Sequence, residues 1–378
     1  MELPKLKIGT LTAPIPIVQG GMGVRVSLAP LASAVANEGG IGTISTIGLG
    51  DIHAPREDYE RLSVEALRTE IQKAQSLLKD KSSPLAINVM GVLSNAEDLV
   101  RASVEEGIQM VVYGAGLPMR LPAWVPDPSV NLVPIISSAR VAELICRSWS
   151  KKYDRVPDGF ILEGPLAGGH LGYSNEQMDN MESCSVEVNL PEILQVLEQY
   201  EDQCGRRIPV IVAGGIYTGE DVARIIQLGA SGVQMGTRFV ATHECSVSDE
   251  FKQAFLDAKK EDIKIVKSPV GMPARALRNN FLDKLERGEK IKVRCSFRCL
   301  TACKMKEAKY CIADKLLDSY FGKIAEGLIF CGQNVHRVSK VVSVRELFQE
   351  LLEGCAQVGN EKRINFGVES EGWNLSSP

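Results

Sequence analysis

Short apolar runs recur along the chain, and segments with mixed polar and apolar residues separate them. The runs are rich in Val and Ile and show no polar alternation, which is typical of parallel strands covered on both faces. We therefore expect eight β-strands, at residues 14–19, 41–46, 85–90, 110–115, 132–137, 159–164, 209–214 and 232–237.

Between these runs, apolar residues recur every three or four positions, which predicts amphipathic helices. The clearest cover residues 28–39, 95–107, 141–154, 189–200 and 218–229. Several close with Gly at or just beyond the last turn, as helices often do. Residues 121–130 contain three prolines and predict a poor helix.

Regular alternation of strands and helices over about the first 260 residues matches a (β/α)₈ TIM barrel. A doubly wound sheet is the alternative, but eight regular units favour closure. We predict an α/β protein with a barrel over residues 1–265, interrupted by a polar segment at about 171–187 that is either a lid or a surface loop. A mainly helical, cysteine-containing extension follows over 266–378, starting with a Pro/Gly turn and a helical segment at 268–277.

Charge and hydropathy argue against some classes of function. The chain has 378 residues, of which 44% are hydrophobic, and 43 Lys and Arg against 47 Asp and Glu give a net charge of −4. Basic runs with interleaved aromatic residues are absent from the sequence, which argues against a nucleic-acid partner. We also expect no membrane span and no signal peptide, and hence a cytoplasmic protein.

Glycine dominates the predicted strand ends, where barrel enzymes carry their chemistry. Gly214 and Gly215 follow the seventh strand, and Gly236 and Thr237 follow the eighth. These two loops are where TIM barrels commonly bind phosphate through backbone N–H groups. The alternative is that each glycine only makes a tight turn. No GxGxxG motif follows a strand, so a Rossmann dinucleotide site is not supported.

Polar or adaptable residues at other strand ends are further candidates. Gln19 and Asn88 interrupt apolar strands, and each is either a ligand contact or a buried structural hydrogen bond. Met22 offers an adaptable apolar contact to a flat ring. His170 stands among glycines in EGPLAGGHLGY (163–173), and its imidazole titrates close to neutral pH, which suits proton transfer. A structural histidine is the alternative.

Four stretches carry a family resemblance: PIVQGGMG (16–23), EGPLAGGHLG (163–172), VIVAGGIYTGEDVARIIQLGASGVQMGTRF (210–239) and SPVGMPAR (268–275). Over about residues 10–280 the chain resembles the nitronate monooxygenases and their close relatives, the FMN-dependent enoyl-acyl-carrier-protein reductases. The resemblance implies a TIM barrel that binds FMN at its C-terminal face, with His170 implicated in catalysis. With the strand-end analysis, it gives the expected cofactor residues: Gln19, Gly21, Met22, Gly23, Asn88, Gly168, Gly169, Gly214, Gly215, Gly236 and Thr237.

Three functions follow from this resemblance. The first is oxidation of alkyl nitronates with O₂, and the second is reduction of an enoyl thioester by NAD(P)H, with acyl carrier protein as a partner. The third is a non-catalytic flavin-binding partner subunit. A homodimer is a further candidate assembly.

A cysteine cluster lies in the extension. Cys295, Cys299, Cys303 and Cys311 have the spacing C-x3-C-x3-C-x7-C. Four thiolates would hold an iron–sulfur cluster or a zinc ion, with Cys331 as a substitute ligand. The spacing matches neither zinc ribbons nor ferredoxins, so buried free thiols are the alternative.

Overall fold

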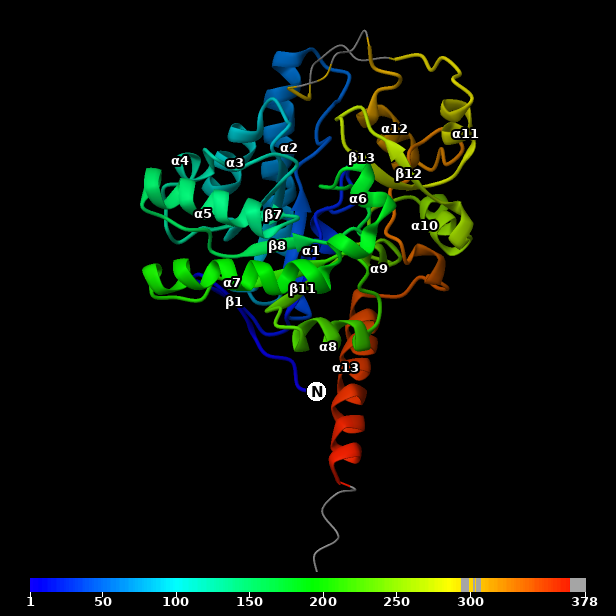
Figure 1. Ribbon diagram of the computed structural model, residues 1–378. Coiled ribbons are helices and arrows are strands. Elements are labelled where there is room, and N and C mark those ends of the chain that lie inside the picture. Colours follow the sequence, from blue (N-terminus) through cyan, green and yellow to red (C-terminus); the bar gives the residue numbers. More distant parts are fainter. Residues whose placement is uncertain (294–298, 302, 304–306, 368–378) are drawn as a thin grey trace, which may run out of the picture.

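The computed structural model describes residues 1–293, 299–301, 303 and 307–367, and its centre is a barrel of parallel strands (Figure 1). The eight-stranded sheet has the order β3-β11-β10-β8-β7-β6-β5-β4. All the predicted strands are confirmed: β3 (Ile17–Gln19), β4 (Gly42–Ser45), β5 (Leu85–Met90), β6 (Met110–Gly114), β7 (Asn131–Ile136), β8 (Phe160–Glu163), β10 (Val210–Ala213) and β11 (Gly232–Met235).

The barrel closes between β3 and β4. Val18 forms a parallel bridge with Ile41, and the Gln19 amide donates to the Ile41 carbonyl at 3.0 Å. A hairpin of β1 (Leu6–Ile8) and β2 (Leu11–Ala13) packs its apolar side chains into the same buried cluster as the barrel interior. Apolar packing thus fills the inside of the barrel.

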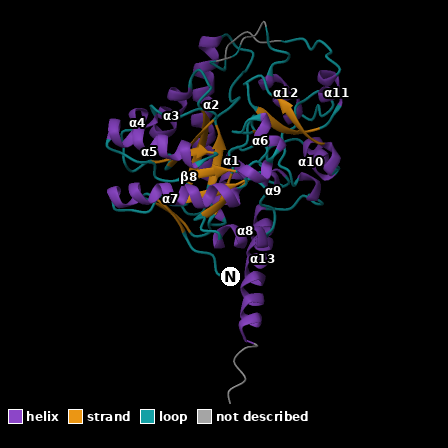
Figure 2. Ribbon diagram, viewed as in Figure 1, coloured by secondary structure: helices purple, strands orange, loops and turns teal. Residues whose placement is uncertain are grey.

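Helices surround the strands, as Figure 2 shows. Those up to the end of the barrel are α1 (Ala29–Asn37), α2 (Arg56–Leu77), α3 (Ala96–Glu105), α4 (Leu121–Trp124), α5 (Ala139–Tyr153), α6 (Asn175–Asp179), η1 (Met181–Cys184), α7 (Val186–Cys204), α8 (Gly219–Gln227), α9 (Thr237–Val240), α10 (Asp249–Leu256) and η2 (Lys260–Asp262). The poor helix expected after β6 is the single turn α4. The Thr218 hydroxyl accepts from the Asp221 amide and caps α8.

The segment at 268–277 corrects one expectation. It forms a turn followed by the strand β13 (Pro273–Leu277), and not a helix. Ala, Arg and Leu favour a helix locally, but tertiary pairing overrides that preference. β13 pairs antiparallel with both β12 (Ile263–Lys267) and β9 (Gly169–His170), so the segment joins the strand that carries His170.

The rest of the extension is mainly helical, as expected. Its helices are α11 (Asn280–Glu286), α12 (Ile312–Tyr320), η3 (Val335–Arg337) and α13 (Val344–Gly367). α13 lies against α8 (Figure 1), with Gly219 at the contact: a Cβ added there would lie 2.1 Å from the Leu351 carbonyl oxygen. The N-terminal amine of Met1 donates a hydrogen bond to the Cys355 carbonyl of α13 at 2.7 Å, which connects the start of the chain to this helix.

The polar segment at 171–187 folds into α6 and η1. Tyr173, Met178 and Cys184 are buried in a small apolar cluster of their own. The Tyr173 hydroxyl donates to the main-chain oxygen of Glu163 at 2.6 Å, which anchors the segment to the end of β8. Within the described residues, no helix is both long enough and apolar enough to cross a membrane.

Candidate active site

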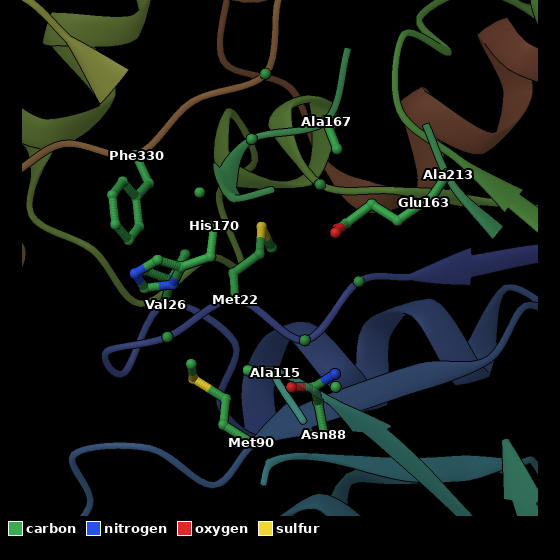
Figure 3. Close-up of a pocket in the computed structure, with 18 of the residues that line it drawn as sticks. Met22, Val26, Asn88, Met90, Ala115, Glu163, Ala167, His170, Ala213 and Phe330 are labelled. Atoms are coloured by element: carbon green, nitrogen blue, oxygen red, sulfur yellow. The ribbon is translucent and has the colours of Figure 1, made fainter. Parts of the chain in front are cut away.

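A cavity of about 470 Å³ opens at the C-terminal ends of the barrel strands. Figure 3 shows side chains from several of these ends directed into it. The structure brings most of the expected residues together on its wall: Gly21, Met22, Gly23, Asn88, Gly168, Gly169, His170, Gly214, Gly215, Gly236 and Thr237. The cavity is therefore the candidate active site.

Gln19 lies behind this wall. Its Nε2 donates to the Ser27 hydroxyl at 2.8 Å, and its Oε1 accepts from the Thr43 amide at 3.0 Å. The side chain is fully buried. These bonds tie the loop after β3 to the start of β4, so Gln19 supports the wall of the cavity from inside the fold.

Several positions of the cavity wall require glycine, either for its backbone conformation or because another residue lies too close for a side chain. Gly214 and Gly215 have φ values of +95° and +81°, which side-chain-bearing residues rarely adopt. A Cβ on Gly21 would lie 2.1 Å from the Asn88 Cβ atom, and one on Gly168 would lie 2.6 Å from the backbone of Cys331. Glycine at these positions lets the main chain itself form the cavity wall.

One end of the cavity suits a phosphate. The backbone N–H groups of Gly215 and Thr237 donate no hydrogen bond within the described part of the chain. The extension closes this end, because the Gly332 amide donates to the Thr237 hydroxyl at 3.0 Å and the Asn334 side chain donates to the Gly215 carbonyl at 2.7 Å. Sequence reasoning missed Gly332 and Asn334, which lie about a hundred residues beyond the glycine loops.

One residue of the cavity wall has a buried polar atom that the described part of the chain leaves unpaired. Gln234 on β11 lines the wall, and its buried Oε1 atom has no hydrogen-bond partner among the described residues. Gln234 was not among the expected cofactor residues, although it has the same signal as Asn88, a polar residue in an apolar strand. A ligand with hydrogen-bonding groups would satisfy these side chains.

His170 projects from β9 beside two residues of the extension. Its Nε2 atom lies 2.7 Å from the Ser268 hydroxyl oxygen. The Phe330 ring meets the imidazole edge-on, with 5.1 Å between ring centroids. Burial lowers the pKa of His170 from 6.5 to about 4, so the imidazole is neutral at pH 7.

Glu163, at the end of β8, is another group of the cavity wall whose pKa is strongly shifted. Burial raises the pKa of its carboxyl group from 4.5 to about 8, and the positive charge of Arg275 offsets part of this rise. Arg275 is itself 1% exposed and donates to the Ala167 carbonyl. The wall thus carries a neutral imidazole and a mostly neutral carboxylic acid at pH 7.

The expected metal site finds no support. Among the described residues, no group of three or more His, Cys, Asp or Glu side chains is placed to hold a metal ion. Cys299, Cys303, Cys311 and Cys331 belong to that part of the chain, whereas Cys295 lies outside it. Cys299 and Cys331 line the cavity, and Cys331 is buried.

Comparison with known proteins identifies the family. A sequence model described as nitronate monooxygenase matches residues 5–354, which is nearly the whole chain. The chain belongs to the nitronate monooxygenase family. It is therefore an oxidoreductase of that family, as the sequence motifs predicted, and membership implies FMN as its cofactor.

Named relatives differ in their substrates. The chain is 29% identical over 277 residues to the (3aS,4S,5R,7aS)-5-hydroxy-7a-methyl-1-oxo-octahydro-1H-indene-4-carboxyl-CoA dehydrogenase of Mycobacterium tuberculosis, covering 73% of this chain and 67% of that protein. The chain thus spans about two thirds of that relative's length. It is 27% identical over 308 residues to a probable nitronate monooxygenase of Staphylococcus saprophyticus, covering 75% and 81%.

Solved structures share the fold. FabK from Thermotoga maritima superposes with a TM-score of 0.72 at 25% identity, over 93% of this chain and 96% of that one. A nitroalkane oxidase from Streptomyces ansochromogenes superposes with a TM-score of 0.71 at 19% identity, over 92% and 98%. These matches agree with the TIM barrel derived above.

The residues present fit an FMN. Gly215 and Thr237 offer unpaired N–H groups at the end closed by the extension, which suits the phosphate. Gln234 and Asn88 offer hydrogen-bonding groups to a polar ring, and Met22 offers an apolar surface. Three observations support this fit. The N–H groups of Gly215 and Thr237 and the Gln234 Oε1 atom have no hydrogen-bond partner among the described residues, and the chain belongs to a family that implies FMN.

Proposed function

We propose that this protein is an FMN-dependent oxidoreductase that acts on a thioester whose reacting acyl group is uncharged, at the carbon–carbon bond beside the thioester carbonyl. The charge state of the cavity carries the proposal. His170 and Glu163 are both held neutral by burial, and none of the described residues that line the cavity is Lys or Arg.

This environment disfavours a buried anion. An alkyl nitronate carries a negative charge, and burying a charge without a partner of opposite sign is costly. The same surroundings already keep the Glu163 carboxyl mostly protonated at pH 7. A thioester enters without that cost because its reacting carbonyl group is neutral.

His170 would position the thioester. A neutral imidazole donates an N–H hydrogen bond to a carbonyl oxygen and stabilises negative charge that develops there. Ser268 and Phe330 hold the ring in place for this role. When bound, FMN supplies or accepts the hydride equivalent, with NAD(P)H as the reductant in the reductive direction.

The rim of the cavity is apolar and exposed, which supports an acyl substrate. Leu117 is 51% exposed and Leu166 is 36% exposed, and both side chains also line the cavity. Exposed leucines beside a cavity offer a surface to an acyl chain. The carboxyl-CoA dehydrogenase among the relatives supports CoA as the carrier of the thioester.

Nitronate oxidation with O₂ is the second candidate. The family match and the relatives named as probable nitronate monooxygenases favour it. A neutral nitroalkane would avoid the cost of burying an anion, with His170 taking its α-proton. A pKa of about 4 makes His170 a weak base for this step, and we therefore rank it second.

Anaerobic rapid mixing tests the proposal. We expect NAD(P)H to bleach the flavin absorbance and trans-2-octenoyl-CoA to restore it, and a His170→Ala variant to slow the restoration. Stronger restoration by octenoyl-acyl carrier protein would identify that protein as the carrier. Bleaching by propyl-2-nitronate, without any response to the enoyl thioesters, would overturn the proposal in favour of the second candidate.

A further inference from the structure

Glu163 presents a carboxyl group to the cavity that the fold leaves without a partner. The residue ends β8 in register with Ala213 of β10 and lines the cavity. Figure 3 shows its side chain extending from that side into the cavity, towards Met22. Within the described chain, no hydrogen bond or ion pair reaches the carboxyl group, although its main-chain oxygen accepts from Tyr173.

The groups around Glu163 do not stabilise its carboxyl group in the ionised form at pH 7. Arg275 is the cation that faces it from β13, but the guanidinium donates to the Ala167 carbonyl and lies 3.6 Å from the Met181 sulfur. The phenol of Tyr173 is neutral, because burial raises its pKa further above 10. Burial likewise raises the pKa values of the nearby thiols, Cys184 beside Tyr173 and Cys331 beside Arg275. His170, on the same cavity wall, is uncharged as well.

We propose that Glu163 acts as a neutral carboxylic acid that donates its O–H to an acceptor atom of the ring bound in the cavity. This inference rests on the proposed function, in which that ring is the isoalloxazine of FMN. A buried, uncharged carboxylic acid that donates a hydrogen bond is established chemistry in enzyme sites.

Neighbouring side chains complement this donor. Gln234 lines the same cavity and has a buried oxygen, an acceptor, without a partner among the described residues, and Asn88 offers both an N–H donor and an oxygen acceptor. The polar edge of a flavin ring carries carbonyl and nitrogen acceptors together with an N–H donor. A protonated Glu163 supplies a donor for that edge, whereas an ionised Glu163 would turn lone pairs towards the acceptors of the ring.

Ring binding should therefore depend on pH. The O–H donor exists below the pKa of Glu163, which is about 8 in the protein, and is lost as the pH rises through that value. Ring binding stabilises the protonated form, so it raises this pKa further. Because the pKa of Glu163 in the complex lies above 8, the bound FMN should be released faster as the pH rises towards 9.5.

The release of FMN from the holoprotein is the measurement. The purified protein is diluted at pH values between 6.5 and 9.5, and the recovery of free-flavin fluorescence gives the release rate. We expect release from the wild type at pH 9.5 to be about tenfold faster than at pH 7, since each pH unit above the pKa weakens a proton-dependent complex by up to about tenfold. A Glu163→Gln variant keeps an N–H donor and cannot ionise, so its rate should change by less than about twofold.

Ionisation of FMN itself affects the wild type and Glu163→Gln equally, because both proteins bind the same ligand. The difference between their pH profiles therefore reports on Glu163. Parallel pH profiles for the wild type and Glu163→Gln would overturn the inference, and so would slower release from the wild type at high pH. If the variant does not fold, the wild type still decides: the infrared band of a protonated carboxylic acid should be present at pH 7 and lost by pH 9.5. A protein that neither contains FMN nor accepts it would instead overturn the proposed function.

Discussion

The Nε2 atom of His170 lies 2.7 Å from the hydroxyl oxygen of Ser268, a residue 98 positions further along the chain. The Ser268 oxygen also accepts from the Val270 amide at 3.3 Å, which leaves its own proton for the imidazole. This arrangement favours the neutral tautomer with the proton on Nδ1. The hairpin of β12 and β13 thus sets both the position of His170 and the nitrogen that carries its proton.

Replacing Ser268 by Ala should impair turnover while leaving the flavin bound. The imidazole loses a hydrogen bond worth about 1 kcal/mol, so kcat/KM should fall about fivefold. Steady-state kinetics with the enoyl thioester and flavin absorbance of the purified protein check the two expectations. Ser76→Ala, on the exposed face of α2, is the control. Unchanged kinetics in Ser268→Ala would show that Ser268 does not position the histidine.

His170 should make the protein less stable at acidic pH. Its pKa is about 4 when folded and 6.5 when unfolded, so between these values the unfolded chain binds the extra proton. Stability is therefore complete above pH 6.5 and falls as the pH drops towards 4, by about 2 to 3 kcal/mol. Urea unfolding at saturating FMN, between pH 7 and 4.5, should show a smaller loss for His170→Asn than for the wild type. Equal losses would contradict the assignment of a buried, neutral histidine.

Adding one methyl group at Gly168 should open the cavity wall. The new Cβ atom would lie 2.6 Å from backbone atoms of Cys331, so the segment that leads to Gly332 and Asn334 has to move. We expect Gly168→Ala to retain less FMN than the wild type after gel filtration. Gly205→Ala separates this clash from general strain, because Gly205 has a positive φ of 67° but no atom within 4 Å of an added Cβ. Equal retention in both variants would argue against the contact with Cys331.

The contact between α8 and α13 should tolerate no side chain at Gly219. An added Cβ atom would lie 2.1 Å from the Leu351 carbonyl oxygen and 2.6 Å from the Cys355 amide nitrogen, so the helices must separate. Overpacking of this kind costs about 1 to 3 kcal/mol. Gly219→Ala should therefore lower the free energy of unfolding by that amount, as urea unfolding measures. Gly288→Ala, where an added Cβ meets open space at a φ of 73°, shows the cost of backbone strain alone.

Local sequence was enough to predict the barrel. Each strand is a buried apolar run with turn residues at its end, and those properties depend on neighbouring residues alone. The hairpin at 263–277 could not be found in this way. Residues 273–277 favour a helix by themselves, and they become a strand because β9, about a hundred residues earlier, supplies hydrogen-bond partners.

Local sequence likewise predicts only part of the candidate site. The glycine loops and His170 follow strands directly, so their common position at one end of the barrel could be predicted. Phe330, Gly332 and Asn334 reach the cavity only because the extension folds back over it. Within the described residues, the Gln234 Oε1 atom and the Glu163 carboxyl group lack a partner, and this also depends on contacts that no local pattern records.

The join between β9 and β13 has a consequence for how the protein matures. A ribosome releases the barrel strands first. The residues that contact His170 and those that close the cavity at Gly215 and Thr237 follow about 30 to 100 residues after β11. A nascent chain that stops after the barrel would carry the histidine on an unpaired strand. Cofactor capture should therefore come late in synthesis, and a bound flavin would serve as a marker that the polypeptide has been completed through Asn334.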